Sequence, residues 1–202
     1  MNGQKKVGWI VLAIVITGIL LGLFQEIILQ EISEKSSVKV AQEANAEQYA
    51  FVISTLKPGQ AYACVNIGTE RSALLVSNFV YDYSNGINAA FEANIYAFDK
   101  NGTVVSHGTA KSDTREYPLS VKEGYLYTGG ENRILKSYVR EGNKYAVTKE
   151  IAQEISDAEG NVTHYFFSMD QQFAGNVADD SNLKRLQQEY SEAAVISFTV
   201  VE

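Results

Sequence analysis

The sequence predicts an α+β protein in which an N-terminal transmembrane helix and a helical stalk precede a mostly antiparallel β-meander domain with one C-terminal helix. Three observations lead to this prediction. Residues 7–24 form an apolar run without a charge. Residues 25–57 are rich in helix-favouring residues and contain neither proline nor glycine. After Pro58 apolar and polar residues alternate, and turn signals become frequent.

The apolar run is long enough to cross a bilayer, because a helix over residues 7–24 would extend roughly 27 Å, close to the thickness of the hydrocarbon core. Lys5 and Lys6 precede it and favour a cytoplasmic N-terminus. No small-residue cleavage site lies directly after Phe24, and Ala44 to Ala46, which has the right residue types, lies too far downstream. We therefore expect a cytoplasmic tail over residues 1–6, an uncleaved membrane anchor over residues 7–29, and a single-pass protein of the cell membrane with an extracellular C-terminal domain.

Residues 30–57 are predicted to form a helical stalk and a docking helix. From residue 41 to residue 56, the apolar residues that share one face of a helix are Ala46, Tyr49, Ala50, Ile53 and Leu56. Such a face is expected to cover an apolar sheet.

Residues 58–202 are predicted to be an extracytoplasmic β-rich domain. The expected strands are 61–67, 72–83, 87–98, 104–111, 124–128, 134–140, 145–155 and 162–167. The clearest hairpin turn is at Asp99 to Gly102, since Asn-Gly suits a type I′ turn. A helix over 182–191, capped by Ser181, precedes a final strand over 194–201, whose apolar composition favours a central place in the sheet.

The composition limits the possible partners. The chain has 17 basic and 24 acidic residues and a formal net charge of −7, which argues against nucleic acid as a partner. Its single cysteine, Cys64, permits no internal disulfide, which is ordinary for a Gram-positive-type envelope, and its apolar neighbours indicate a buried core residue.

Several segments carry a family resemblance. The stretch from Tyr62 to Val76, together with residues 94–99, 117–120 and 124–130, resembles uncharacterised exported proteins of clostridial (Firmicute) bacteria. In that family a tyrosine-bearing strand precedes an Asp-x-Asp-Gly-Asp-Gly loop, which implies calcium. Here the matching positions are Asn66, Gly68 and Glu70, so the loop is degenerate, one ligand is missing, and we predict no metal.

The sequence predicts no catalytic residues, metal or cofactor. His107 and His164 lie on separate predicted strands and lack the helical spacing of a zinc site, so both are interpreted as partly exposed strand residues. Thr128 to Gly130 is interpreted as a hairpin turn rather than as a phosphate-binding loop.

The candidate binding residues are tyrosines. Tyr125 and Tyr127 share one face of a short predicted strand, and Tyr138 is expected opposite them. Aromatic rows can stack on sugars or grip an extended peptide, and they can equally form one wall of a core.

The sequence therefore favours a membrane-anchored, non-enzymatic module that binds an envelope protein or glycan. One alternative is a pilin-like structural subunit, since Lys5 to Gly8 precedes an apolar helix that leads to a β domain, although Ala13 stands where pilins usually carry glutamate. A second alternative is a cell-envelope hydrolase whose site has no recognisable motif.

Overall fold

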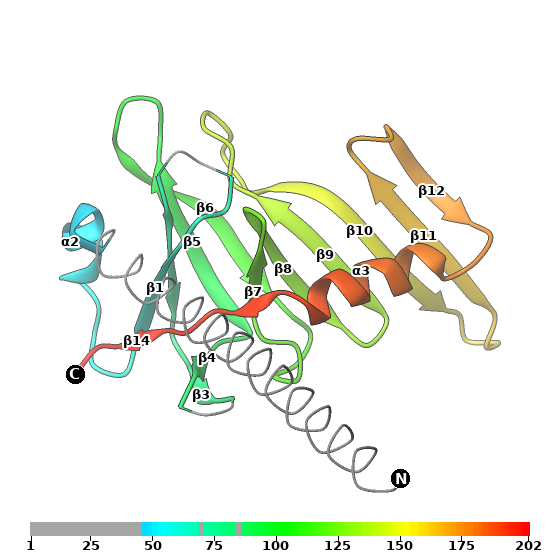
Figure 1. Cartoon of the computed structure of the whole chain (residues 1–202), viewed down its shortest axis with the longest axis horizontal. Helices are drawn as coiled ribbons and strands as arrows, with labels where there is room; N and C mark the ends of the chain where they lie inside the picture. Colours follow the sequence, from blue (N-terminus) through cyan, green and yellow to red (C-terminus); the bar gives the residue numbers. More distant parts are fainter. Residues whose placement is uncertain (1–45, 69–70, 84–85) are drawn as a thin grey trace, which may run out of the picture. The chain divides into compact units, whose positions relative to one another are not determined.

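The computed structural model describes residues 46–68, 71–83 and 86–202, which belong to one compact unit spanning Gln42–Glu202 (Figure 1). The predicted tail, the anchor and most of the stalk lie outside the described residues. Within the described ranges, no helix is both long enough and apolar enough to cross a membrane.

The unit is built mainly from two antiparallel sheets. A five-stranded sheet has the order β14 (Thr199–Val200), β1 (Ala61–Val65), β2 (Ala73–Ser77), β5 (Glu92–Phe98) and β6 (Val104–Lys111). A seven-stranded sheet has the order β12 (Phe173–Val177), β11 (Val162–Ser168), β10 (Val147–Ser156), β9 (Arg133–Tyr138), β8 (Tyr125–Gly130), β7 (Ser120–Lys122) and β13 (Ala194–Val195). A small ribbon pairs β3 (Tyr81–Asp82) with β4 (Asn88–Ala89).

The predicted meander is confirmed in its main part, because β7 to β12 lie side by side in sequence order and every strand pair of the described residues is antiparallel. The predicted final central strand is wrong. Its residues form two short edge strands, since β13 pairs with β7 and β14 pairs with β1. The buried side chains of Ile196 and Phe198 lie between them, in the core that the two sheets share.

Helices cover the outer faces of the two sheets. The helix α3 (Ser181–Ser191), which the sequence predicts within one residue, packs on the seven-stranded sheet through Leu183 and Leu186. Across the molecule, a 3₁₀ turn η1 (Glu47–Tyr49) and the short helix α2 (Ala50–Ile53) pack on the five-stranded sheet. The arrangement has four layers, with the two sheets in the middle.

The described part of the docking helix differs from its prediction. Tyr49 is buried, and its hydroxyl donates a hydrogen bond of 2.7 Å to the carbonyl of Ser72. Ala50, however, is exposed, and Val52 contacts the sheet instead. The 3₁₀ turn has three residues per turn, so it shifts the face that a continuous α-helix would present. Cys64 lies in the same core, as predicted, and burial raises the pKa of its thiol to about 11.

The turn between β5 and β6 occurs where predicted, with a different geometry. The amide of Gly102 donates to the carbonyl of Asp99, and Gly102 has a φ of +75°. Asn101 is not among the residues with positive φ, so the turn is not type I′. The Asp99 carboxylate instead accepts hydrogen bonds from the amides of Asn101 and Thr103, which lower the pKa of this carboxyl group.

Candidate functional site

Residues of both sheets line a half-open hollow of about 560 Å³, which we call the inter-sheet cavity. The five-stranded sheet contributes Ile95 and the stretch 107–111, and the seven-stranded sheet contributes residues of β8, β9 and β10. The volume lies within the range of small-molecule sites, roughly 300–1,000 Å³. The cavity is therefore large enough for a small ligand.

A bulge in β6 lies next to His107, which lines this cavity. The pairing of β5 with β6 shifts by one residue between Asn94 and Tyr96, so β6 has an extra residue at this point. Gly108 occupies the bulge with a φ of +91°, a conformation that glycine adopts without strain. His107 shares the face of Val105, which pairs with Ala97 of the core, and it is buried with 2% of its surface exposed; the bulge returns Ala110 to the same face.

Neither ring nitrogen of His107 has a hydrogen-bond partner among the described residues. Burial lowers the pKa of the imidazole from its ordinary value of 6.5, so the ring is neutral at pH 7. A neutral imidazole presents one N–H donor and one acceptor nitrogen. Both nitrogens belong to a residue that lines the cavity, and both atoms are themselves buried.

Thr128 adds a third unpaired polar atom from the facing sheet. It lies in β8, it is 1% exposed, and its Oγ1 has no partner among the described residues. Buried polar side chains are nearly always hydrogen-bonded, and leaving one unpaired costs about 1–3 kcal/mol. Two unpaired polar side chains that line the same cavity are the strongest indication of a ligand site in the described part of the chain.

The prediction that Thr128 to Gly130 forms a turn is wrong, because these residues complete β8. The glycines permit close packing there. A Cβ atom on Gly130 would lie 1.9 Å from Oδ2 of Asp113, and one on Gly129 would lie 2.6 Å from Cδ1 of Ile134. The chain that leaves β6 can thus pack against β8, where Asp113 also lines the cavity.

The charged residues that line the cavity are paired. Arg133 forms an ion pair with Asp113, and Lys111 forms one of 2.6 Å with Glu92. The cavity wall therefore carries no excess charge from these side chains.

An aromatic ring lies at the edge of the cavity. Tyr145 precedes β10 and is 61% exposed, and its Cδ1 would lie 3.5 Å from a Cβ atom on Gly108. The amide of Ala146 donates to the carbonyl of His107 at 2.9 Å and ties this segment to the bulge. The ring is available for contact with a bound molecule.

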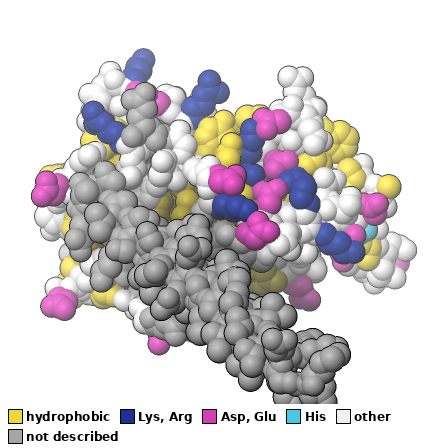
Figure 2. Space-filling view, in the orientation of Figure 1, with side chains coloured by type: hydrophobic (Ala, Val, Ile, Leu, Met, Phe, Trp, Pro, Cys, Tyr) yellow, Lys and Arg dark blue, Asp and Glu magenta, His cyan; other side chains and the backbone are white. Residues whose placement is uncertain are grey.

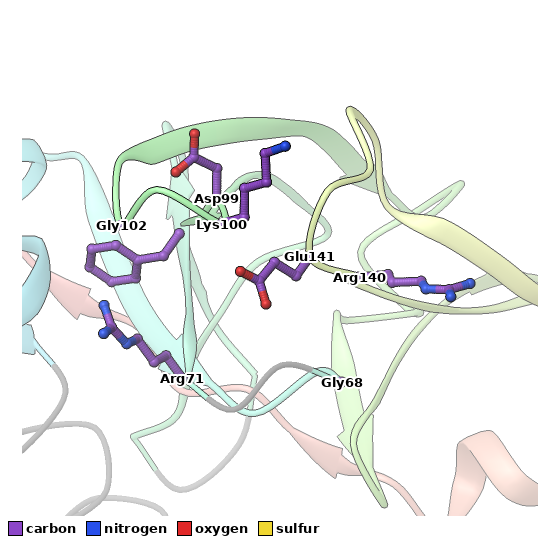
Figure 3. Close-up of a pocket in the computed structure, with 8 residues that line it drawn as sticks. Gly68, Arg71, Asp99, Lys100, Gly102, Arg140 and Glu141 are labelled. Carbon is purple, nitrogen blue, oxygen red and sulfur yellow. The ribbon is translucent and has the colours of Figure 1, made fainter.

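A second hollow, the loop cleft, has a volume of about 390 Å³ and lies where the turns after β1, β5 and β9 meet (Figure 3). In the figure the carboxylate of Glu141 points into the cleft, whereas Arg140 points away from it. The guanidinium of Arg71 lies 4.8 Å from the centre of the Phe98 ring. The cleft mixes both signs of charge, and its lining includes none of the buried unpaired polar atoms of the described residues.

The degenerate loop of the family resemblance borders this cleft. Gly68 has a φ of +90°, and a Cβ atom there would lie 3.0 Å from Tyr138 and from the carbonyl of Val139. Glu70 lies outside the described residues. Among those described, no three metal-ligating side chains of the His, Cys, Asp and Glu types come together.

None of the three candidate tyrosines lines the inter-sheet cavity; Tyr125 and Tyr127 pack in the cluster that includes α3, and Tyr138 contacts Tyr125. Tyr125 and Tyr138 face each other as predicted, with ring centres 6.0 Å apart and planes at 84°. Tyr127 is 1% exposed, and its hydroxyl donates a hydrogen bond of 3.0 Å to Glu189. Burial raises the pKa of Tyr127, and the bond to Glu189 raises it further.

An ion-pair network links α3 to the sheet beside Tyr127. Glu189 accepts hydrogen bonds from Lys136 at 2.9 Å and from Arg185 at 2.6 Å, and Arg185 also pairs with Glu150. Figure 2 shows such acidic and basic side chains intermingled on the face that carries α3. The network joins the helix to β9 and β10.

The sequence interpretation missed the two residues that mark the inter-sheet cavity. It placed His107 as partly exposed, and the structure corrects this, because the ring lies on the face of β6 that packs toward the second sheet. His164 is half-buried, with its Nδ1 3.8 Å from Glu154. The available signal was alternation along the strand, which puts His107 on the face of Val105.

No protein-family model, curated protein or solved structure matches the chain, so the resemblance to clostridial exported proteins stays a prediction.

Proposed function

We propose that this chain is a membrane-anchored extracytoplasmic module that binds an envelope component in the inter-sheet cavity. The observation that carries the proposal is the pair of buried side chains, His107 and Thr128, that line the cavity without a hydrogen-bond partner among the described residues. The fold would be more stable with apolar residues at these positions, so a bound partner gives a reason for the polar ones. The anchor over residues 7–29, which the sequence predicts, would keep the site at the cell surface.

The geometry favours binding over hydrolysis. A nucleophilic hydroxyl or thiol needs a base within hydrogen-bonding reach, and the base is usually oriented by a third group. His107 has no hydrogen bond to a hydroxyl or a carboxylate within the described ranges. The only cysteine, Cys64, lies on the opposite face of the five-stranded sheet, in the core under α2.

Photocrosslinking in intact cells tests this proposal. A benzophenone amino acid replaces Tyr145 at the edge of the cavity, in the full-length chain. We expect an adduct with an envelope component, because the Tyr145 ring is 61% exposed next to the cavity. The control carries the same amino acid at Phe173, which is 38% exposed on the outer strand β12.

The expected result is an adduct at position 145 that is absent at position 173 and is weakened by Thr128→Val, a change inside the cavity. Equal adducts at both positions, or none at position 145, would refute a binding role for the cavity. Protease treatment of intact cells, followed by detection of a tag after residue 202, tests the predicted orientation separately.

A further inference from the structure

We infer that a second copy of this chain covers an open face of the seven-stranded sheet, so that two copies form a symmetric dimer. The inference goes beyond the proposed function and does not rest on it. Two observations carry it. The seven-stranded sheet extends past the five-stranded sheet, and the face that this extension leaves open is apolar and nearly free of charge.

The extension is the part of the seven-stranded sheet beyond β8. The edge strand of the five-stranded sheet, β6, contacts β8 across the interior. In the strand order β9, β10, β11 and β12 follow β8, and Figure 1 shows β10 to β12 leading away from the five-stranded sheet. We call these four strands the overhang. Its outer face is covered by α3, which packs in one cluster with Ile134, Ala152 and Phe166.

The inner face of the overhang, opposite α3, carries an apolar row. Leu135 of β9 pairs with Ile151 of β10, which pairs with Phe167 of β11. Phe167 in turn pairs with Ala174 of β12. Paired residues of antiparallel strands share a face, and alternation puts this row on the side away from Ile134. None of the four side chains is buried or belongs to a core cluster of the described residues.

Charge distinguishes the two faces of the overhang. The outer face carries Lys136, Glu150 and Glu154, as water-facing strands usually do. Among the paired inner-face positions of these described strands, Arg133 alone is charged, and it forms an ion pair with Asp113. In a chain with a net charge of −7, an uncharged face can pack on a copy of itself without like-charge repulsion.

A second copy fits this face because the two overhangs have the same width. When the second copy is turned about a two-fold axis between the layers, its overhang continues the layer of the first copy's five-stranded sheet. Its β12 then lies beside β6 and over β9, and its β11 lies over β10. The first copy's overhang continues the other layer in the same way. Each overhang gains the facing sheet that a sandwich requires, whereas any other partner would have to bring an apolar sheet of this width.

The fit includes the inter-sheet cavity, which is half-open and lined by β6 and β9. The second copy's β12 would close its open side. Alternation places the small side chains Ala174 and Asn176 on the inner face of this strand. β12 contains neither a charged residue nor proline, the residues that commonly keep edge strands apart.

The area of the overhang predicts a weak dimer. Four strands that are about 4.8 Å apart and about 20 Å long present a flat face of roughly 400 Å² in each copy. Accessible surface exceeds flat area, and stable specific interfaces begin near about 1,200 Å² in total. We therefore expect a reversible equilibrium between monomer and dimer. Chains that the predicted anchor confines to one membrane would be shifted toward the dimer.

Sedimentation of the full-length chain in detergent micelles, over a range of protein concentrations, tests the inference. We expect a monomer at low concentration and a dimer at high concentration. Ala174→Arg should weaken the dimer about 100-fold or more, because it would bury a charge without a counter-charge. The position is exposed in the single chain, so folding is not at risk.

Two further variants form a matched pair. Ile155 lies on the inner face of β10 and is 47% exposed, so Ile155→Arg should also weaken the dimer. Val162 lies on the outer face of β11 and is 49% exposed. Val162→Arg is the control and should dimerise as the wild type does.

A chain that stays monomeric at every concentration would overturn the inference. A dimer that Ala174→Arg and Ile155→Arg leave unchanged would also overturn it, since that dimer would form through another surface. In intact cells, a benzophenone amino acid at position 174 should give an adduct of doubled mass that is absent at position 162. An adduct with a different protein alone would overturn self-association. The crosslinking experiment at position 145 decides the proposed function independently.

Discussion

Replacing Thr128 with valine should stabilise the ligand-free protein. The side chain is 1% exposed, and its hydroxyl has no partner among the described residues. An unpaired buried hydroxyl costs about 1–3 kcal/mol, and valine replaces it with a methyl group of nearly the same shape. We therefore expect the free energy of unfolding to rise by about 1–3 kcal/mol. For a domain of this size, each kcal/mol corresponds to a rise in Tm of roughly 2–4 °C.

Circular dichroism of the full-length chain in micelles, during thermal or urea unfolding, measures this change. The control is Thr163→Val, an exposed position where we expect a change within about 0.5 kcal/mol. A loss of more than about 1 kcal/mol in Thr128→Val would refute the reasoning, because it would mean that the hydroxyl has a partner in the free protein. A variant that is more stable and yet binds less would show that Thr128 serves binding at the expense of stability.

Two further predictions concern charge. Glu189→Gln should destabilise the protein by about 2–3 kcal/mol in the same melting experiment, because the Lys136 side chain is only 13% exposed and would lose its counter-charge. The control is Glu92→Gln, in an exposed pair, which should cost less than about 1 kcal/mol. Burial holds the pKa of His107 in the folded protein below its unfolded value of 6.5. As the pH drops below 6.5, the imidazole of the unfolded chain is therefore protonated before that of the folded protein, and the free energy of unfolding should fall. His107→Phe should flatten this part of the stability profile, and an unchanged profile would contradict the burial argument.

Much of the β domain could be predicted from the sequence because its strands follow regular alternation. The strand β6 has the predicted bounds, and α3 begins one residue before its predicted start. Two strands were missed. β12 has the sequence Phe-Ala-Gly-Asn-Val and lies at a sheet edge, where little apolar surface is buried, and β7 spans three residues, too few to show a period.

The site was harder to predict because it depends on packing between distant parts of the chain. Alternation along β6 puts His107 on the face of Val105, which pairs with Ala97 of the shared core, and the packing of the two sheets buries it there. The interpretation of Thr128 as a turn residue followed from the two glycines after it. These glycines leave room for the side chains of Asp113 and Ile134. Asp113 is distant from them in the sequence, and Ile134 returns to them across the hairpin, so no local pattern reveals either contact.

The pairing of residues 194–200 with both sheets has a consequence for the order of folding events. β1 is among the first strands of the domain to leave the ribosome, and its partner β14 is the last. The two ends of such a long segment meet slowly, because the chain between them must lose conformational entropy before the contact forms. During synthesis, an unfinished chain would therefore expose one edge of each sheet, and the arrival of a single short segment would cover both.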